Sequence, residues 1–244
     1  MDGTFQSLKD QFILNFIDDD RWKWILTGLK STLIITFFSL IIGLIIGIIV
    51  ASIRSTYDKN AEAFKLRGGA SYGIMRVLNA ICNFYLTVVR GTPAVVQLLI
   101  AYFIIFASVS NGIYVAIFAF GINSGAYVAE ILRGGIMSID NGQFEAGRSL
   151  GFNYFQTMRF IIIPQVIKNV LPALCNEFIS LLKETSISGY VGIVDLTKAG
   201  DLIRGRTFSP YMPLFAVALI YLIIVIILTQ LVRLLERRLR SSDR

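Results

Sequence analysis

The chain has 244 residues, a net charge of +7 and a mean hydropathy of +0.67, with 55% hydrophobic and 16% charged residues. Soluble domains carry about 25% charged residues, so this composition excludes an ordinary soluble domain and indicates a membrane protein. Histidine is absent, which excludes histidine catalysis and histidine zinc sites, and the two cysteines, Cys82 and Cys175, lack metal-ligand spacing.

The chain begins with an acidic segment, residues 1–20, which lacks the basic region of a signal peptide. Arg90 and Pro93 interrupt the second of five apolar segments and predict a kink or irregular stretch there. The fold predicted is all-α: a polytopic membrane protein of about five transmembrane helices. The five predicted segments are residues 25–53, 77–107, 112–132, 165–188 and 211–232.

Lys and Arg residues are unevenly distributed between the two sides of the predicted membrane. Fourteen of the 23 lie in residues 54–76, 133–168 and 233–244, whereas six lie on the opposite side. Because cytoplasmic loops carry the excess of Lys and Arg, these three regions are predicted to be cytoplasmic and the N-terminus to lie outside. The basic residues are therefore interpreted as a topology signal, with no nucleic acid as partner.

The region 133–168 is patterned too regularly for a passive connector. Its first half predicts a short helix, Ile139–Leu150. Asp140 or Asn141 can cap the start of this helix, because a side-chain oxygen there accepts from an unpaired helix N–H group. Gly151 then supplies the left-handed residue that commonly ends a helix.

The second half of the region predicts another short helix, Tyr154–Ile162, capped by Asn153 and ended by Pro164. Apolar side chains on this helical pair would be exposed to water unless a partner covers them. The alternative is that the pair lies flat on lipid headgroups. The apolar residues concerned are Phe144, Ala146, Leu150, Phe152 and Phe155.

The spacing in this loop resembles the EAA motif of ABC importer permeases: EAA, three residues, glycine, nine residues, then isoleucine, any residue, a branched aliphatic and proline. Here Glu145, Ala146 and Gly147 open the pattern, and Gly151 and Pro164 complete it. Glycine thus replaces the second alanine. In that family the motif forms the coupling helix that inserts into the ATPase subunit, so the resemblance implies an ATPase-coupling role for these five residues.

Three further segments are similar to the polar amino-acid (histidine/glutamine-type) branch of that family. They are Val89–Pro93, which contains an RGTP block, Tyr127–Ile136 and Pro172–Ser186. The resemblance covers about residues 20–232. It implies a type I ABC importer permease (MetI-like) fold and a polar amino acid as cargo.

This resemblance also implies the organisation of the chain. Residues 1–24 would form an extracytoplasmic segment, 25–232 the transmembrane permease domain with the coupling loop 133–168, and 233–244 a cytoplasmic basic tail. The expected location is the inner (plasma) membrane of a bacterium. Implied partners are ATPase subunits, an extracytoplasmic substrate-binding protein and a second permease subunit, either a copy of this chain or a paralogue.

The sequence has no Gly-Lys dipeptide and therefore no phosphate-binding P-loop. The chain is accordingly expected not to be an enzyme, to hold no cofactor or metal, and to rely on a partner ATPase that binds ATP and Mg.

Polar residues within predicted spans are costly, by roughly 2.5–3.5 kcal/mol for a charge, and usually face a partner or a water-filled path. Glu177 and Ser180 share a stripe of the fourth helix. The functional interpretation is that a carboxylate there holds a substrate ammonium group, and that Arg90 binds a substrate carboxylate. The alternative is that Glu177 pairs with Arg90 or Lys183 to neutralise charge. The candidate pathway residues are Glu177, Asn176, Ser180, Arg90 and Thr92.

Three rival functions stay open at the level of sequence. One is an ABC permease for another small solute, such as methionine. Another is an ATP-independent amino-acid channel or secondary transporter. The third is a purely structural membrane anchor.

Overall fold

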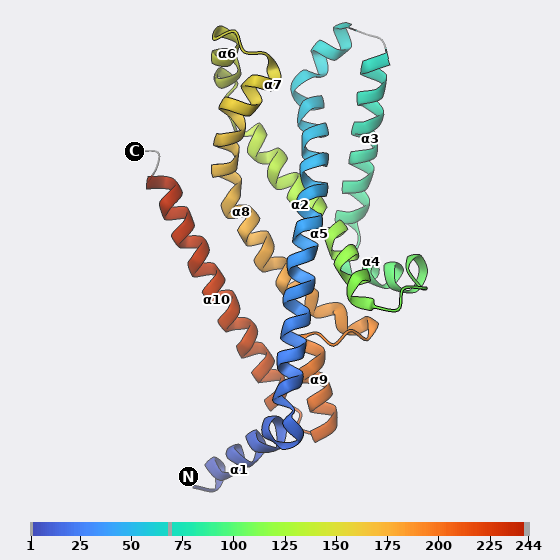
Figure 1. The fold of residues 1–244 in the computed structure, drawn as a ribbon, viewed down its shortest axis with the longest axis vertical. Coiled ribbons are helices and arrows are strands. Elements are labelled where there is room, and N and C mark those ends of the chain that lie inside the picture. Colours follow the sequence, from blue (N-terminus) through green and yellow to red (C-terminus); the bar gives the residue numbers. More distant parts are fainter. Residues whose placement is uncertain (1, 68–69, 242–244) are drawn as a thin grey trace. The chain divides into compact units, whose positions relative to one another are not determined.

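The computed structural model describes residues 2–67 and 70–241, and every regular element in these ranges is helical (Figure 1). The α-helices are α1 Asp2–Phe12, α2 Trp22–Arg67, α3 Ala70–Gly91, α4 Ala94–Ile100, α5 Gly112–Met137, α6 Asn141–Ser149, α7 Tyr154–Thr157, α8 Ile163–Glu184, α9 Leu196–Thr207 and α10 Met212–Ser241. The π-helical turns are η1 Ile13–Ile17, η3 Ala101–Ile105 and η4 Met158–Ile162, and the 3-10 segments are η2 Asp18–Asp20 and η5 Thr185–Val191.

Five helical stretches of the described chain are long and apolar enough to cross a membrane, as the sequence predicted. They are Trp22–Lys59, Tyr72–Gly91, Gly112–Met137, Tyr154–Val191 and Met212–Leu239. The expected irregularity of the second segment is confirmed. Helix α3 ends at Gly91, and after Pro93 the chain continues as the short helix α4.

The prediction that Pro164 ends a helix is wrong. The backbone stays helical from α7 through the π-helical turn η4 into α8, and Pro164 lies in the first turn of α8. Proline lacks an N–H group and clashes with the carbonyl group four residues earlier, which breaks a regular α-helix. The π-helical turn immediately before Pro164 already interrupts the regular bonding, so the ring is accommodated without ending the helix.

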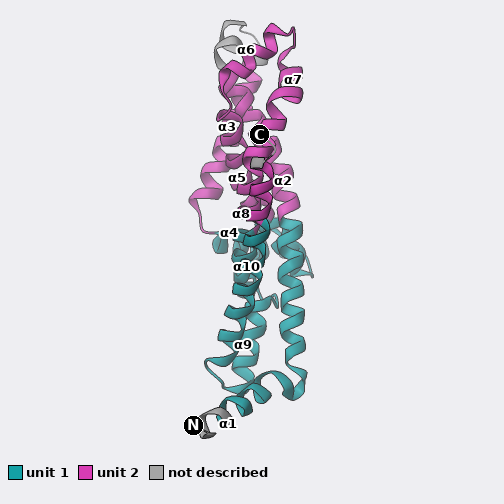
Figure 2. Cartoon of the chain, turned by 90° about the vertical axis from the view of Figure 1, so that its left-hand side faces the viewer, with its two compact units in different colours: residues 1–39, 94–120, 179–231 teal, residues 40–93, 121–178, 232–244 magenta. Residues whose placement is uncertain are grey.

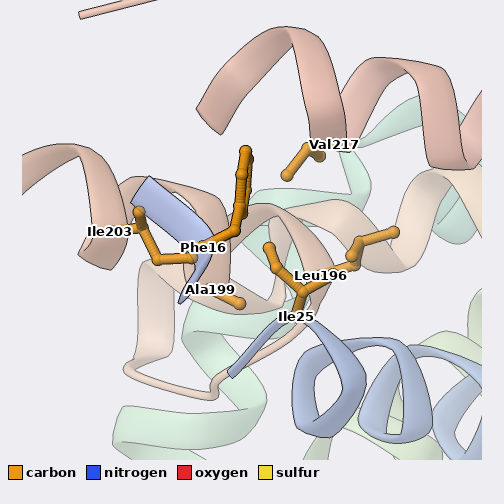
Figure 3. Packing of buried hydrophobic residues seen from close by; sticks show 6 residues of the cluster. All are labelled: Phe16, Ile25, Leu196, Ala199, Ile203 and Val217. Carbon is orange, nitrogen blue, oxygen red and sulfur yellow. The ribbon is translucent and has the colours of Figure 1, made fainter. Parts of the chain in front are cut away.

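The chain divides into two compact units, coloured separately in Figure 2. The first unit comprises residues 1–39, 94–120 and 179–231. Its core brings the start of the chain against α9 and α10 (Figure 3). The buried residues of this core are Phe16, Ile25, Leu196, Ala199, Ile203 and Val217. Gly200 allows the close approach of α9 to α10, because a side chain there would overlap Val217.

The second unit comprises residues 40–93, 121–178 and 232–244 and has two buried clusters. One joins α2, α3 and α5; its members are Val50, Cys82, Leu86, Val89, Ala126 and Ala129. The other joins the end of α5 to the region of η4 and α8; its members are Ile136, Ile139, Ile162, Val166 and Val170. Cys82 is buried in the first of these clusters and Cys175 is half-buried, and neither cysteine forms a disulfide.

Candidate functional site

The EAA-like loop in the second unit has the two helix starts that the sequence predicted. Asp140 caps α6, and its side chain accepts a hydrogen bond of 2.6 Å from the backbone N–H of Gly142. Gly151, at φ +80°, adopts the predicted left-handed conformation after α6. Asn153 and Gln156 form a reciprocal capping box at the start of α7, with two side-chain to backbone bonds of 2.9 Å. These residues set the start and end of α6 and the start of α7.

The glycine of the EAA-like motif lies where α6 meets α7. Gly147 is buried, and a Cβ atom at this position would lie 2.6 Å from both Oγ1 and Cγ2 of Thr157. On the same pair of helices, the rings of Phe144 and Tyr154 stack with 6.4 Å between centroids and 15° between planes. The absence of a side chain at Gly147 therefore permits this close packing of α6 on α7.

The outer surface of the loop is partly apolar. Leu150 and Phe155 are 69% and 72% exposed, and Ala146 is also exposed. Phe144 and Phe152, for which the sequence also predicted exposure, are half-buried. The loop thus presents a small apolar tip rather than a full apolar face.

A cavity of about 430 Å³ lies beside α6 at the base of this loop. Both signs of charge line it: Asp58 and Lys59 from α2, and Glu145 and Arg148 from α6. The Lys59 ammonium group donates a 2.7 Å hydrogen bond to the side chain of Asn141, the first residue of α6. Glu145 of the EAA-like motif therefore lines the same cavity as Asp58 and Lys59 of α2.

The candidate pathway residues are distributed over both units. Glu177, on α8 in the second unit, accepts a 2.8 Å hydrogen bond from the hydroxyl group of Ser124 on α5. Asn176, beside it, is exposed. Thr92 lies in the break after α3 and donates a 2.8 Å bond to the carbonyl of Val88. Ser180 lies further along α8 and belongs to the first unit.

Arg90 belongs to a cluster of charges that the sequence did not reveal. Glu130 on α5 lies 3.3 Å from Arg54 on α2, 3.7 Å from Arg90 on α3 and 3.3 Å from Arg133. Arg133 also lies 3.3 Å from Asp58. The i, i+3 spacing of Glu130 and Arg133 is visible in the sequence, but nothing in the sequence places Arg54 and Arg90 beside them. We call these five residues the Glu130 cluster.

Comparison with known proteins assigns the family. Residues 68–241 match the model of the family described as "Binding-protein-dependent transport system inner membrane component". The chain belongs to this family. It is therefore a multi-pass permease subunit of the ABC transporter class, a class whose members work with ATPase and substrate-binding partners.

Individual relatives of the permease agree with this assignment. The arginine transport system permease protein ArtQ of Bacillus subtilis is 38% identical over 224 residues, covering 90% of this chain and 94% of the relative. The glutamine transport system permease protein GlnP of Escherichia coli is 34% identical over 220 residues, covering 88% and 93%.

Solved structures confirm the predicted MetI-like fold of the permease. One chain, from a crystal structure of an amino acid ABC transporter with histidines, has a TM-score of 0.76 at 37% identity and covers 88% of this chain and 94% of its own length. A chain of the MetNI methionine ABC transporter in an inward-facing conformation has a TM-score of 0.74 and covers 91% and 99%; at 20% identity it supports the fold alone.

The first unit of the permease contains a buried carboxylate that sequence reasoning missed. Asp195 is fully buried and caps α9, where its Oδ1 atom accepts a 2.9 Å hydrogen bond from the backbone N–H of Lys198. Its Oδ2 atom has no hydrogen-bond partner among the described residues. Burial raises the pKa of Asp195 to about 6, against the smaller opposing effects of the backbone N–H groups of Lys198 and Thr197.

Proposed function

We propose that this permease forms the translocation pathway of an importer for polar amino acids, and that a separate ATPase drives it through the loop of α6 and α7. The observation that carries the proposal is the shape of this loop: a rigid, capped helical pair with Leu150 and Phe155 exposed at its tip. Exposed apolar groups on a rigid support are the usual form of a protein-docking element.

The relatives support the choice of cargo, because the permeases named for arginine and glutamine are 38% and 34% identical over most of this chain. Within the pathway, we assign Glu177 and its neighbours Asn176 and Ser180 to the ammonium or cationic group of the amino acid. Arg90 and Thr92 would bind the carboxylate and other polar groups of the amino acid. Glu177 lies on a spanning helix, where its carboxylate accepts a hydrogen bond from the hydroxyl group of Ser124.

The charge distribution supports an orientation with residues 1–24 outside, the coupling loop and residues 233–244 in the cytoplasm, and the chain in the inner membrane of a bacterium. In this arrangement ATP and Mg bind to the partner ATPase alone, and this chain transmits rather than catalyses. A second permease subunit, identical or paralogous, completes the pathway, and a substrate-binding protein delivers the amino acid from outside.

Docking of the ATPase is tested by Phe155→Asp, which puts a charge on the apolar tip of the loop. The ATPase should co-purify with the wild-type permease and be lost from the variant. Phe208→Asp is the matched control, because Phe208 is another exposed aromatic residue, 91% exposed, in the turn after α9. ATPase association that survives Phe155→Asp would contradict the proposed docking site.

Cargo and energy source are tested together in proteoliposomes that contain the permease, its ATPase and its binding protein. Uptake of a labelled polar amino acid should require ATP and should be inhibited by other polar amino acids but not by methionine. Flux without ATP would favour the channel or secondary transporter. Glu177→Gln should weaken transport or alter specificity; unchanged transport and specificity would remove Glu177 from the pathway.

A further inference from the structure

Two adjacent residues of α2 contact different parts of the second unit. Lys59 reaches α6: besides its 2.7 Å bond to Asn141, its ammonium group lies 4.8 Å from the centre of the Phe144 ring. Asp58 faces α5, where it accepts a hydrogen bond of 3.3 Å from Arg133. One turn of α2 therefore holds both the first residues of the coupling helix and the end of α5.

From Arg133 the contacts continue without interruption to the end of α3. Arg133 pairs with Glu130, and Glu130 pairs with Arg90. The Arg90 guanidinium also lies 5.9 Å from the ring centre of Tyr127 on α5. Arg90 is in the last turn of α3, directly before the break that contains Thr92 and Pro93.

The charges of this cluster are closely balanced, so the ion pairs depend on how the three helices are placed. Three guanidinium groups from three helices share two carboxylates, and the paired side chains are only partly exposed, between 18% and 46%. Partly buried ion pairs are screened less by salt than surface pairs, and their energy depends strongly on distance. A displacement of α2 or α5 therefore changes how strongly Glu130 holds Arg90.

We propose that Lys59 and Glu130 are positioning residues that connect the coupling helix α6 to Arg90. Movement of α6 then changes the positions of the pathway residues Arg90 and Thr92 at the end of α3. The inference rests on the proposed function, since it requires an ATPase to move α6. It assigns the coupling to these specific side-chain contacts within one unit and not to the general packing of the helices.

The test uses the complete transporter, with ATPase and binding protein, and measures basal ATP hydrolysis, its stimulation by loaded binding protein, and amino-acid uptake. Lys59→Met should leave ATPase association and basal hydrolysis intact but reduce stimulation and uptake by about fivefold or more, the lower end of typical allosteric coupling. Lys59→Arg, which keeps the charge, should restore most of the coupling. Lys30→Met, at an exposed lysine of the same helix, is the matched control and should behave as wild type.

A double-mutant cycle decides whether the residues act along one path. As a single substitution, Glu130→Gln should reduce coupling; Asp58→Asn takes its place if Glu130→Gln lowers stability. Combined with Lys59→Met, either substitution should cause little further loss of coupling. Fully additive losses, or a Lys59→Met transporter that is coupled like wild type, would overturn the inference. A wild-type complex that neither binds an ATPase nor imports amino acids would instead overturn the proposed function.

Discussion

Replacing Asp195 by asparagine should stabilise the permease, although it alters a fully buried helix cap. Asparagine caps helices about as well as aspartate, so the hydrogen bond from the backbone N–H of Lys198 is retained. What changes is the charge. Raising the pKa of Asp195 from 3.8 to about 6 means that its ionised form costs about 3 kcal/mol more in the folded protein than in the unfolded chain.

The sign of the pH dependence follows from this elevated pKa. Below pH 4 the carboxyl group is protonated in both states, and the wild type and Asp195→Asn should be equally stable. Between about pH 4 and pH 6 only the unfolded chain loses the proton, so wild-type stability falls relative to that of the variant. Above pH 6 the difference stays constant, at about 3 kcal/mol or about 6–12 °C in the unfolding midpoint for a chain of this size.

Thermal unfolding of the purified permease, followed from pH 4.5 to pH 8 for both proteins, measures this difference. Asp195→Ala serves as the control, because it removes the cap at every pH and should lose about 0.5–2 kcal/mol of the stability gained by Asp195→Asn. A variant less stable than wild type at pH 8, or a difference independent of pH, would refute the assignment of Asp195 as a carboxylate strained by burial.

Three further predictions concern glycines at close contacts. Gly147→Ala should lower the unfolding midpoint of the permease and its ATPase association, because the added methyl group overpacks against Thr157 at a cost of about 1–3 kcal/mol; adding Thr157→Ala should restore both. Gly151→Ala should destabilise by about 1–2 kcal/mol, since φ is +80° there, and limited proteolysis of the loop should become faster. Gly200→Val should separate α9 from α10 and lower the unfolding midpoint, because the added side chain would overlap Val217. Adding Val217→Ala to this variant should partly restore the midpoint. An unchanged midpoint for Gly200→Val would show that α10 moves freely.

The features that the sequence predicted correctly are those set by neighbours in the chain. Long apolar stretches defined the five spans, and the caps at Asp140 and Asn153 and the left-handed Gly151 depend on residues within a few positions. Pro164 misled the prediction because a π-helical turn, which has no clear sequence signal, removes the usual conflict of proline with a helix.

The Glu130 cluster could not be predicted for a different reason. Its charges come from α2, α3 and α5, and the paired residues Arg54 and Glu130 are 76 positions apart in the chain. One sequence gives no information on which faces of three helices meet. Asp195 was missed because its neighbourhood resembles an ordinary polar loop; only the structure shows that the carboxylate is fully buried.

The π-helical turn Met158–Ile162 has a consequence for how this loop tolerates insertions and deletions. A π-helical turn holds one residue more than an α-helical turn, so the nine-residue spacing between Gly151 and Ile161 includes an extra residue. Deleting one residue here, for example Arg159, should convert the turn to regular α-helix and leave the helix before it in about the same rotational setting relative to α8, because the π-helical turn already absorbs the extra residue. The tip with Phe155 would then face in about the same direction, whereas a one-residue deletion within the regular part of α8 would turn the tip by about 100°.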